Sequence, residues 1–131
     1  MENVIYKMDQ HLDLLNKSLE LTEKMLADAN TENINGIEAD AQNRERLLNI
    51  IATLQTEIEN ELKACQPEKT LNMKVQNWVS RTQICVEQIF QVDQKLLDTL
   101  HAIKDKTHQE IGVVHKQKQG VKGYNLNNVK R

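Results

Sequence analysis

The chain contains few of the residues that interrupt a helix or build a sheet. Its 131 residues include one proline, four glycines, one Trp, two Tyr and one Phe. A β-sandwich or barrel needs turn residues at short intervals, so this composition argues against both. Cys65 and Cys85 form no CxxC or other metal-ligand spacing, which is the pattern expected in a reducing cytoplasm.

Long hydrophobic runs and catalytic motifs are also missing. No apolar run approaches the length of a membrane span, and the first ten residues mix charges with apolar side chains, unlike a secretory signal. The four glycines are scattered, so no phosphate-binding loop is present, and no serine lies beside a base or in a glycine elbow. We expect a cytoplasmic, non-catalytic protein without a cofactor or membrane insertion.

The charge is unevenly distributed along the chain. Residues 1–62 carry 5 Lys/Arg and 13 Asp/Glu, a net charge of −8, whereas residues 63–131 carry 12 and 6, a net charge of +6. The last 21 residues contain five basic residues and no acid. Opposite charges favour packing of the early helices against the later one, or attraction of the tail to the body. Because Tyr124 is the only aromatic residue near these charges and no recognition fold is evident, we expect no nucleic-acid binding.

Hydrophobic spacing predicts two helices in the first half of the chain. Residues 3–29 form the first, because apolar residues recur at steps of three and four. The turn around Asn30–Asn33 follows, with Asn33 as the N-cap of a second helix over 34–64. This helix is expected to be weakly anchored over the polar run Asp40–Glu45, and Pro67 ends it. The expected seam of the first helix is Ile5, Met8, Leu12, Leu15, Leu19, Thr22, Leu26 and Ala29.

The third predicted helix, residues 70–119, is the longest. It contains no proline and only one glycine, Gly112, so it could reach about 75 Å, against about 40 and 46 Å for the others. Thr70 is its expected cap, and Trp78 and Phe90 are expected in the core. The sequence predicts an all-α antiparallel bundle of three long helices, the last projecting beyond the others. Residues 1–119 form a single domain, followed by a flexible basic tail, 120–131.

The projecting end of the third helix is the candidate binding surface. Apolar residues at positions 103, 111, 114 and 121 form a stripe that the shorter helices are not expected to reach. Such a stripe suits an amphipathic helix from another protein, and Tyr124 is a candidate docking anchor beyond it. The predicted stripe consists of Ile103, Ile111, Val114 and Val121.

Polar residues on the same helix suggest two other kinds of site. His101, His108 and His115 recur every seven residues, with Asp98 and Asp105 on the same face. Successive histidines would lie roughly 10 Å apart along the axis, too far to share one metal ion, so we favour a solvated polar stripe and expect no metal. His101-Ala102-Ile103-Lys104 also resembles the His-x-x-Lys core of histidine phosphotransfer domains, but Asp105 replaces the glycine that follows in those domains, and its charge opposes phosphotransfer.

Three segments resemble the FliT/FlgN group of flagellar type III export chaperones. The first is Leu19-Glu20-Leu21-Thr22-Glu23-Lys24-Met25-Leu26, which is followed by a short Asn-rich turn. The second is Ile37-Glu38-Ala39-Asp40-Ala41-Gln42-Asn43-Arg44-Glu45-Arg46-Leu47-Leu48, an acidic stretch that leads into an Arg–Leu–Leu run. The third is the closing basic segment Lys116-Gln117-Lys118-Gln119-Gly120-Val121-Lys122-Gly123-Tyr124. The resemblance covers most of the chain.

This resemblance, with the FliT type favoured, implies a cytoplasmic chaperone for an exported flagellar axial protein. The client would be the filament cap or a hook–filament junction protein, bound through its C-terminal helical region. Tyr124 would help to dock the loaded chaperone on the cytoplasmic domain of the export gate protein FlhA. The export ATPase complex and a flagellar transcription regulator are further partners that the family implies.

Two alternative functions remain open from the sequence. In one, the protein is a self-associating coiled-coil adaptor, in which a second copy covers the stripe, and a weak homodimer is compatible with the chaperone function as well. In the other, the protein is a histidine phosphotransfer domain that uses His101.

Overall fold

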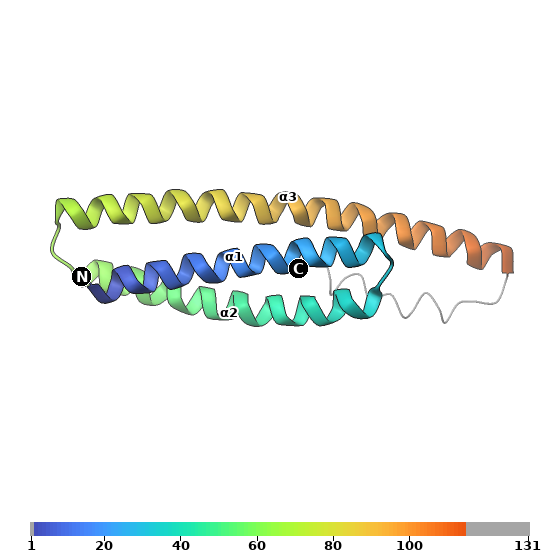
Figure 1. Cartoon of the computed structure of the whole chain (residues 1–131), viewed down its shortest axis with the longest axis horizontal. Helices are drawn as coiled ribbons and strands as arrows, with labels where there is room; N and C mark the ends of the chain where they lie inside the picture. Colours follow the sequence, from blue (N-terminus) through green and yellow to red (C-terminus); the bar gives the residue numbers. More distant parts are fainter. Residues whose placement is uncertain (1, 115–131) are drawn as a thin grey trace.

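The computed structural model describes residues 2–114, with side chains through residue 107. Three helices make up this part of the chain: α1 (Glu2–Asn30), α2 (Ile34–Ala64) and α3 (Lys69–Val114). They form the antiparallel all-α bundle that the sequence predicts, and no strand occurs within residues 2–114. Figure 1 shows α2 running back along α1, and α3 running in the same direction as α1. The predicted helix end at residue 119 and the tail 120–131 lie outside the described residues.

Buried residues repeat every seven positions along α1, as expected for a helix that packs in a bundle. The predicted seam of α1 is partly correct. Five of its eight members are buried, whereas the other three, Ile5, Leu19 and Leu26, are only half-buried at the edge of the buried surface. Two polar residues, His11 and Ser18, take central positions instead. The two buried rows are Val4, His11, Ser18 and Met25 in one, and Met8, Leu15, Thr22 and Ala29 in the other.

The hairpin between α1 and α2 has the predicted cap. The Asn33 side chain accepts a hydrogen bond from the Gly36 backbone N–H at 3.1 Å, which satisfies a donor in the first turn of α2. Glu32 adopts a left-handed φ of 56°, which few non-glycine residues adopt. Thr70 is not a cap, because α3 begins at Lys69.

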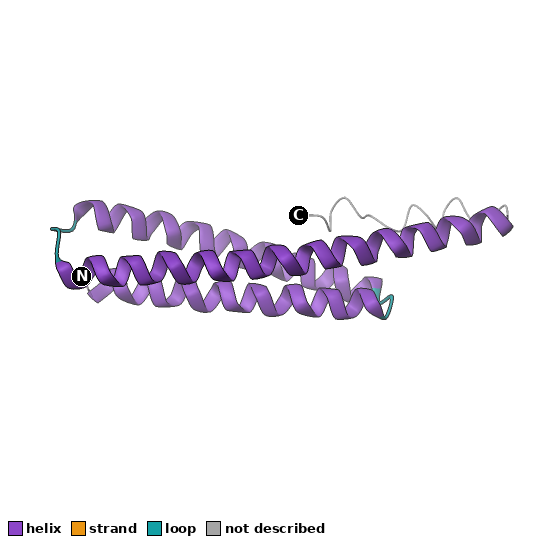
Figure 2. Cartoon of the chain, turned by 90° about the horizontal axis from the view of Figure 1, so that it is seen from above, coloured by secondary structure: helices purple, strands orange, loops and turns teal. Residues whose placement is uncertain are grey.

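Helix α1 is the centre of the bundle. It packs along both α2 and α3, whereas α2 and α3 barely approach each other. Figure 2 gives the view from above, in which α3 continues beyond the α1–α2 hairpin. Lys106 lies 3.5 Å from the Glu32 carboxylate in that hairpin, so the remainder of α3, to Val114, extends beyond its partners. This projection was predicted from helix length.

Candidate functional site

Helix α3 carries exposed apolar side chains that its own bundle does not cover. Trp78 is 8% exposed, as predicted for a core residue. The prediction for Phe90 is wrong, because 60% of it is exposed. A helix with apolar residues on more than one side is normally covered on more than one side. Through residue 107, the exposed large apolar residues of α3 are Met73, Val79, Ile84, Val86 and Phe90.

Three of these residues lie on one strip of α3. At 3.6 residues per turn, Val79, Val86 and Phe90 fall within about 40° of one another, roughly 100° around the helix from the core residue Trp78. They are 41%, 50% and 60% exposed. Asp93, one turn beyond Phe90, contacts Arg44 of α2. The strip therefore borders the side of α3 that faces α2.

Helix α2 contributes to the same surface. Leu48 lies one turn from Arg44 and is 37% exposed. Arg44 of α2 contacts Asp93 of α3, and the two helices are antiparallel. Moving one turn towards the C-terminal end of α2, from Arg44 to Leu48, therefore corresponds to moving one turn towards the N-terminal end of α3 from Asp93. Leu48 therefore lies at the level of Val86 and Phe90. We call these four residues the α2–α3 face: Leu48, Val79, Val86 and Phe90.

The predicted stripe at the end of α3 is not a single exposed surface. Ile103 is only 7% exposed and packs in a core cluster with Met25 and Ile37, so its placement beyond the reach of the first two helices is wrong. The physical reason is that the hairpin reaches as far as Lys106. Ile111 and Val114 lie in the projecting turns of α3, where side chains are not described. Val121 and Tyr124 lie outside the described residues.

Among the described side chains, the histidine and aspartate candidates of α3 lie in solvent. The exposed residues are His101, Lys104, Asp98 and Asp105. Within the described residues, no three His, Cys, Asp or Glu side chains come together to hold a metal ion. The side chain of His108 is not described, and His115 lies outside the described residues. This arrangement supports neither the disfavoured metal site nor the alternative of phosphotransfer at His101.

A buried polar contact joins α1 to α3. The indole Nε1–H of Trp78 donates to Nδ1 of His11 at 3.1 Å, and the two rings meet edge to face with centroids 5.2 Å apart. His11 is completely buried, and this burial lowers the pKa of its imidazole below the usual value, partly offset by Gln55 of α2. Since Nδ1 accepts the hydrogen bond, the neutral ring carries its proton on Nε2.

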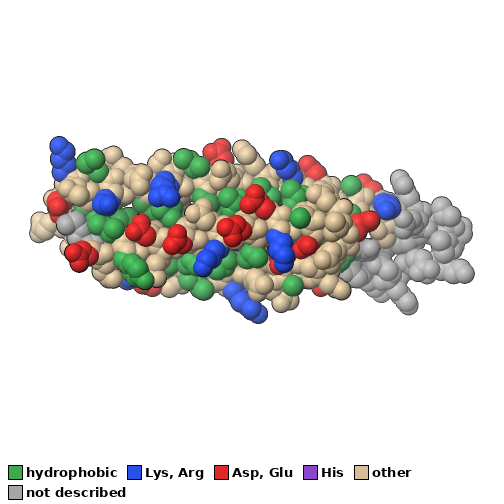
Figure 3. Space-filling view, viewed as in Figure 1, with side chains coloured by type: hydrophobic (Ala, Val, Ile, Leu, Met, Phe, Trp, Pro, Cys, Tyr) green, Lys and Arg blue, Asp and Glu red, His purple; other side chains and the backbone are tan. Residues whose placement is uncertain are grey.

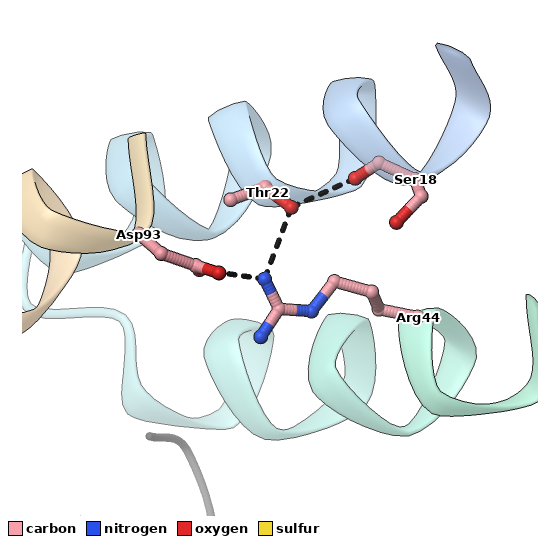
Figure 4. Close-up of polar contacts among 4 residues, drawn as sticks. All are labelled: Ser18, Thr22, Arg44 and Asp93. Carbon is pink, nitrogen blue, oxygen red and sulfur yellow. Dashed lines mark hydrogen bonds and ion pairs between the residues drawn. The ribbon is translucent and has the colours of Figure 1, made fainter. Parts of the chain in front are cut away.

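A second buried polar layer involves all three helices. One guanidinium nitrogen of Arg44 donates to Thr22 Oγ1 at 3.1 Å and to an Asp93 carboxylate oxygen at 2.6 Å. Thr22 in turn donates to the Ser18 carbonyl at 2.8 Å. Figure 4 shows Arg44 reaching from α2 to meet Thr22 on α1 and Asp93 on α3.

This buried polar layer was not predicted from the sequence, and the burial of α2 around it was underestimated. The first half of α2 was expected to be weakly anchored, but Asp40 and Arg44 are each only 3% exposed and Ile37 is 1% exposed. The signal that could have identified Arg44 is its spacing. It lies seven residues from both Ile37 and Ile51, which are buried, so a helical repeat places it in the core.

Two carboxylates meet near the hairpin. Lys24 Nζ contacts one carboxylate oxygen of Asp40 at 3.0 Å, while the other Asp40 oxygen and one oxygen of Asp28 are buried without a hydrogen-bond partner. The neighbouring Asp40 carboxylate raises the pKa of Asp28 above its usual value, and burial acts in the same direction. Asp28 therefore keeps its proton to a higher pH than a free aspartate does.

Two open grooves flank α1 in the described part of the chain. A groove of about 550 Å³ lies between α1 and α2 over Leu14, Ile50 and Leu54, and one of about 290 Å³ lies between α1 and α3 next to Trp78. In the face that Figure 3 shows, hydrophobic side chains lie in small patches separated by acidic and basic side chains. The charged residues Asp13, Lys17 and Glu57 also line the larger groove.

Comparison with known proteins finds no matching family model, no matching curated protein and no matching solved structure. Within the described part of the chain, no helix is sufficiently long and apolar to span a bilayer.

Proposed function

We propose that the protein is an export chaperone that binds the C-terminal helical region of a flagellar axial protein, either the filament cap or a hook–filament junction protein. It would deliver this client to the cytoplasmic domain of the export gate protein FlhA, with Tyr124 as a docking residue. The export ATPase complex is a further candidate partner. The resemblance of residues 19–48 and 116–124 to the FliT/FlgN group supports the proposal.

The observation that carries the proposal is the α2–α3 face. Fully burying a large apolar side chain contributes about 1.5–3 kcal/mol, so covering four half-exposed residues contributes on the order of 3–6 kcal/mol. Association costs about 4 kcal/mol or more. A partner that touched only these residues would therefore bind weakly. An amphipathic helix that continues along α3 would cover further apolar surface and bind more tightly.

The α2–α3 face replaces the predicted stripe as the central part of the client site. Ile103 is part of the core and is not available to a client. Ile111 and Val114 remain candidate contacts on the projecting turns of α3. The client would then lie along α3, from the α2–α3 face towards its projecting end.

A pull-down with matched variants tests this location. The baits are the wild type, a Val86→Gln/Phe90→Gln variant, and Ile84→Gln as the control. Ile84 is 56% exposed on the same helix, but lies about 200° around it from Val86. The test proteins are the filament-cap and hook–filament junction proteins of the same organism. We expect the double variant to lose at least about tenfold in affinity and Ile84→Gln to bind as the wild type does.

Deletion of residues 111–131 distinguishes the face from the projecting end. If the deletion abolishes binding while Val86→Gln/Phe90→Gln leaves it unchanged, the client binds at the end of α3 and our location is wrong. If none of these axial proteins binds the wild type, the chaperone function itself is rejected. Circular dichroism confirms that each variant remains folded.

Self-association is the second candidate function, because a second copy could cover the same face. Sedimentation measurements at micromolar concentration test it. A tight dimer that becomes monomeric with Val86→Gln/Phe90→Gln would favour the adaptor, whereas a monomeric wild type leaves the face available for a client.

A further inference from the structure

The hydrophobic core consists of two separate clusters. The proximal cluster lies near the α2–α3 connection and includes Trp78 and Ile58, and the distal cluster lies near the hairpin and includes Leu96 and Leu100. The full proximal set is Val4, Met8, Leu12, Leu15, Ile51, Ile58, Leu71, Trp78 and Cys85. The full distal set is Met25, Ala29, Ile37, Leu96, Leu100 and Ile103.

The polar layer of Ser18, Thr22, Arg44 and Asp93 occupies the interval between these clusters. On α1 it falls between Leu15 and Met25, on α2 between Ile37 and Ile51, and on α3 between Cys85 and Leu96. Figure 4 shows the Arg44 guanidinium between Thr22 of α1 and Asp93 of α3 at this level. No fully buried apolar residue of the described chain lies at this level, where the apolar side chains Leu19, Leu47 and Ile89 are only half-buried. The two clusters can therefore lose their packing separately.

Arg44 and Asp93 also supply the one direct polar link between α2 and α3 among the described side chains. The other ion pairs with described side chains join α1 to α2 or α3 to the hairpin. The backbones of α2 and α3 barely approach each other, so this contact at 2.6 Å adds a direct polar link to the apolar contacts of the shared core. Arg44 is 3% exposed, so its charge depends on Asp93 for compensation.

We propose that the Arg44–Asp93 pair is a latch that lets the distal half of the bundle open while the proximal half stays folded. With the latch broken, α3 beyond Asp93 separates from the α1–α2 hairpin and exposes Leu96, Leu100 and Ile103 to a partner helix. These residues lie on α3, which also carries three of the four residues of the α2–α3 face, so opening extends that face along α3. The role of the latch in client binding rests on the proposed function, but the opening itself is a property of the free protein.

Hydrogen exchange of the full-length protein without a partner tests the latch. Asp93→Asn removes the countercharge at constant size. We expect exchange to become at least about tenfold faster in residues 34–44 and 96–107 and to stay near the wild-type rate in residues 4–15 and 75–89. Lys7→Met is the matched control, because it removes ion pairs to Glu57 and Glu61 in the proximal half and should leave distal exchange unchanged.

A second variant keeps the test decisive if Asp93→Asn does not fold. Arg44→Met/Asp93→Leu, which we call the sealed variant, replaces the two charged residues of the polar layer with apolar side chains that join the two clusters. We expect distal exchange at least about tenfold slower than in the wild type. Equal acceleration along the whole chain in Asp93→Asn, or unchanged distal exchange in the sealed variant, would overturn the latch.

The failure of the latch and the failure of the proposed function give different results. The exchange experiment contains no client, so its outcome does not depend on what the protein binds. If the sealed variant exchanges slowly but binds an axial protein as the wild type does, the latch exists but does not serve client binding. If no axial protein binds any variant, the chaperone function fails and the exchange result still stands.

Discussion

Acidification should destabilise the protein through one residue, His11. The ring is completely buried and neutral, and its Nδ1 accepts a hydrogen bond from Trp78. Protonation of Nδ1 would place its N–H against the N–H of Trp78 and a positive charge in the core. The folded-state pKa of His11 is therefore below its usual value, because of burial. The unfolded chain, in contrast, binds a proton near pH 6.5.

The sign and size of the effect follow from proton linkage. Between the ordinary pKa and the lowered one, the unfolded state binds one more proton than the folded state. The free energy of unfolding therefore falls as the pH falls through this window, by at most about 1.4 kcal/mol per pH unit. For a domain of this size, that loss lowers the melting temperature by roughly 3–6 °C per unit. Above about pH 7 the contribution of His11 should be constant.

Urea unfolding followed by tryptophan fluorescence measures this directly, because Trp78 is the only tryptophan. The comparison is between the wild type and His11→Gln at several pH values from 7.5 to 5.5. The glutamine oxygen can still accept the Trp78 N–H, but the side chain does not titrate. We expect the wild type to lose stability below pH 6.5 and His11→Gln to lose much less.

Equal changes in stability in the two proteins between pH 7.5 and 5.5 would refute this reasoning. Other groups, such as Asp28, titrate in both proteins, so only the difference between the two proteins reports on His11. No difference would mean that the folded protein accepts a proton on His11 without cost, which is incompatible with a buried ring that accepts a hydrogen bond from Trp78.

Two further predictions concern the hairpin end. Leu100 is 2% exposed in the distal cluster, so Leu100→Ala should cost about 2–5 kcal/mol, measured as a lower melting temperature. Asp40 raises the pKa of Asp28 in the folded protein. In the pH range just above the usual pKa of an aspartate, the folded protein therefore keeps a proton that the unfolded chain releases. The free energy of unfolding falls as the pH rises through this range. Asp40→Asn should therefore raise the melting temperature at pH 7 and remove the gain on acidification; a lower melting temperature at pH 7 would contradict this.

Much of the fold could be predicted from local patterns. Apolar spacing and the Asn33 cap gave α2 at its observed bounds of Ile34–Ala64 and placed the start of α1 and α3 within one residue. Periodicity and capping act within a few turns, so they are visible in the sequence without knowledge of partners. Helix α3 contains no helix-breaking residue apart from Gly112, and this likewise predicted a helix longer than the other two.

The candidate site was harder to predict, because exposure depends on where neighbouring helices lie. Ile103 and Phe90 are both apolar residues on α3. The sequence predicted an uncovered Ile103 and a buried Phe90, and both predictions are wrong. The hairpin extends far enough to bury Ile103, while the separation of α2 from α3 leaves Phe90 uncovered. Neither fact follows from the sequence of α3 itself.

The sequence by itself determined that this chain makes three long helices, because hydrophobic repeats, caps and the scarcity of breakers act locally. Only the tertiary structure decided which residues meet at the centre. His11, Ser18 and Arg44 each lie at a seven-residue interval from buried residues, but their polarity suggests solvent until partners from other helices are in place. Trp78 and Asp93, distant in sequence, supply those partners, and this is possible because α1 packs against both other helices at once.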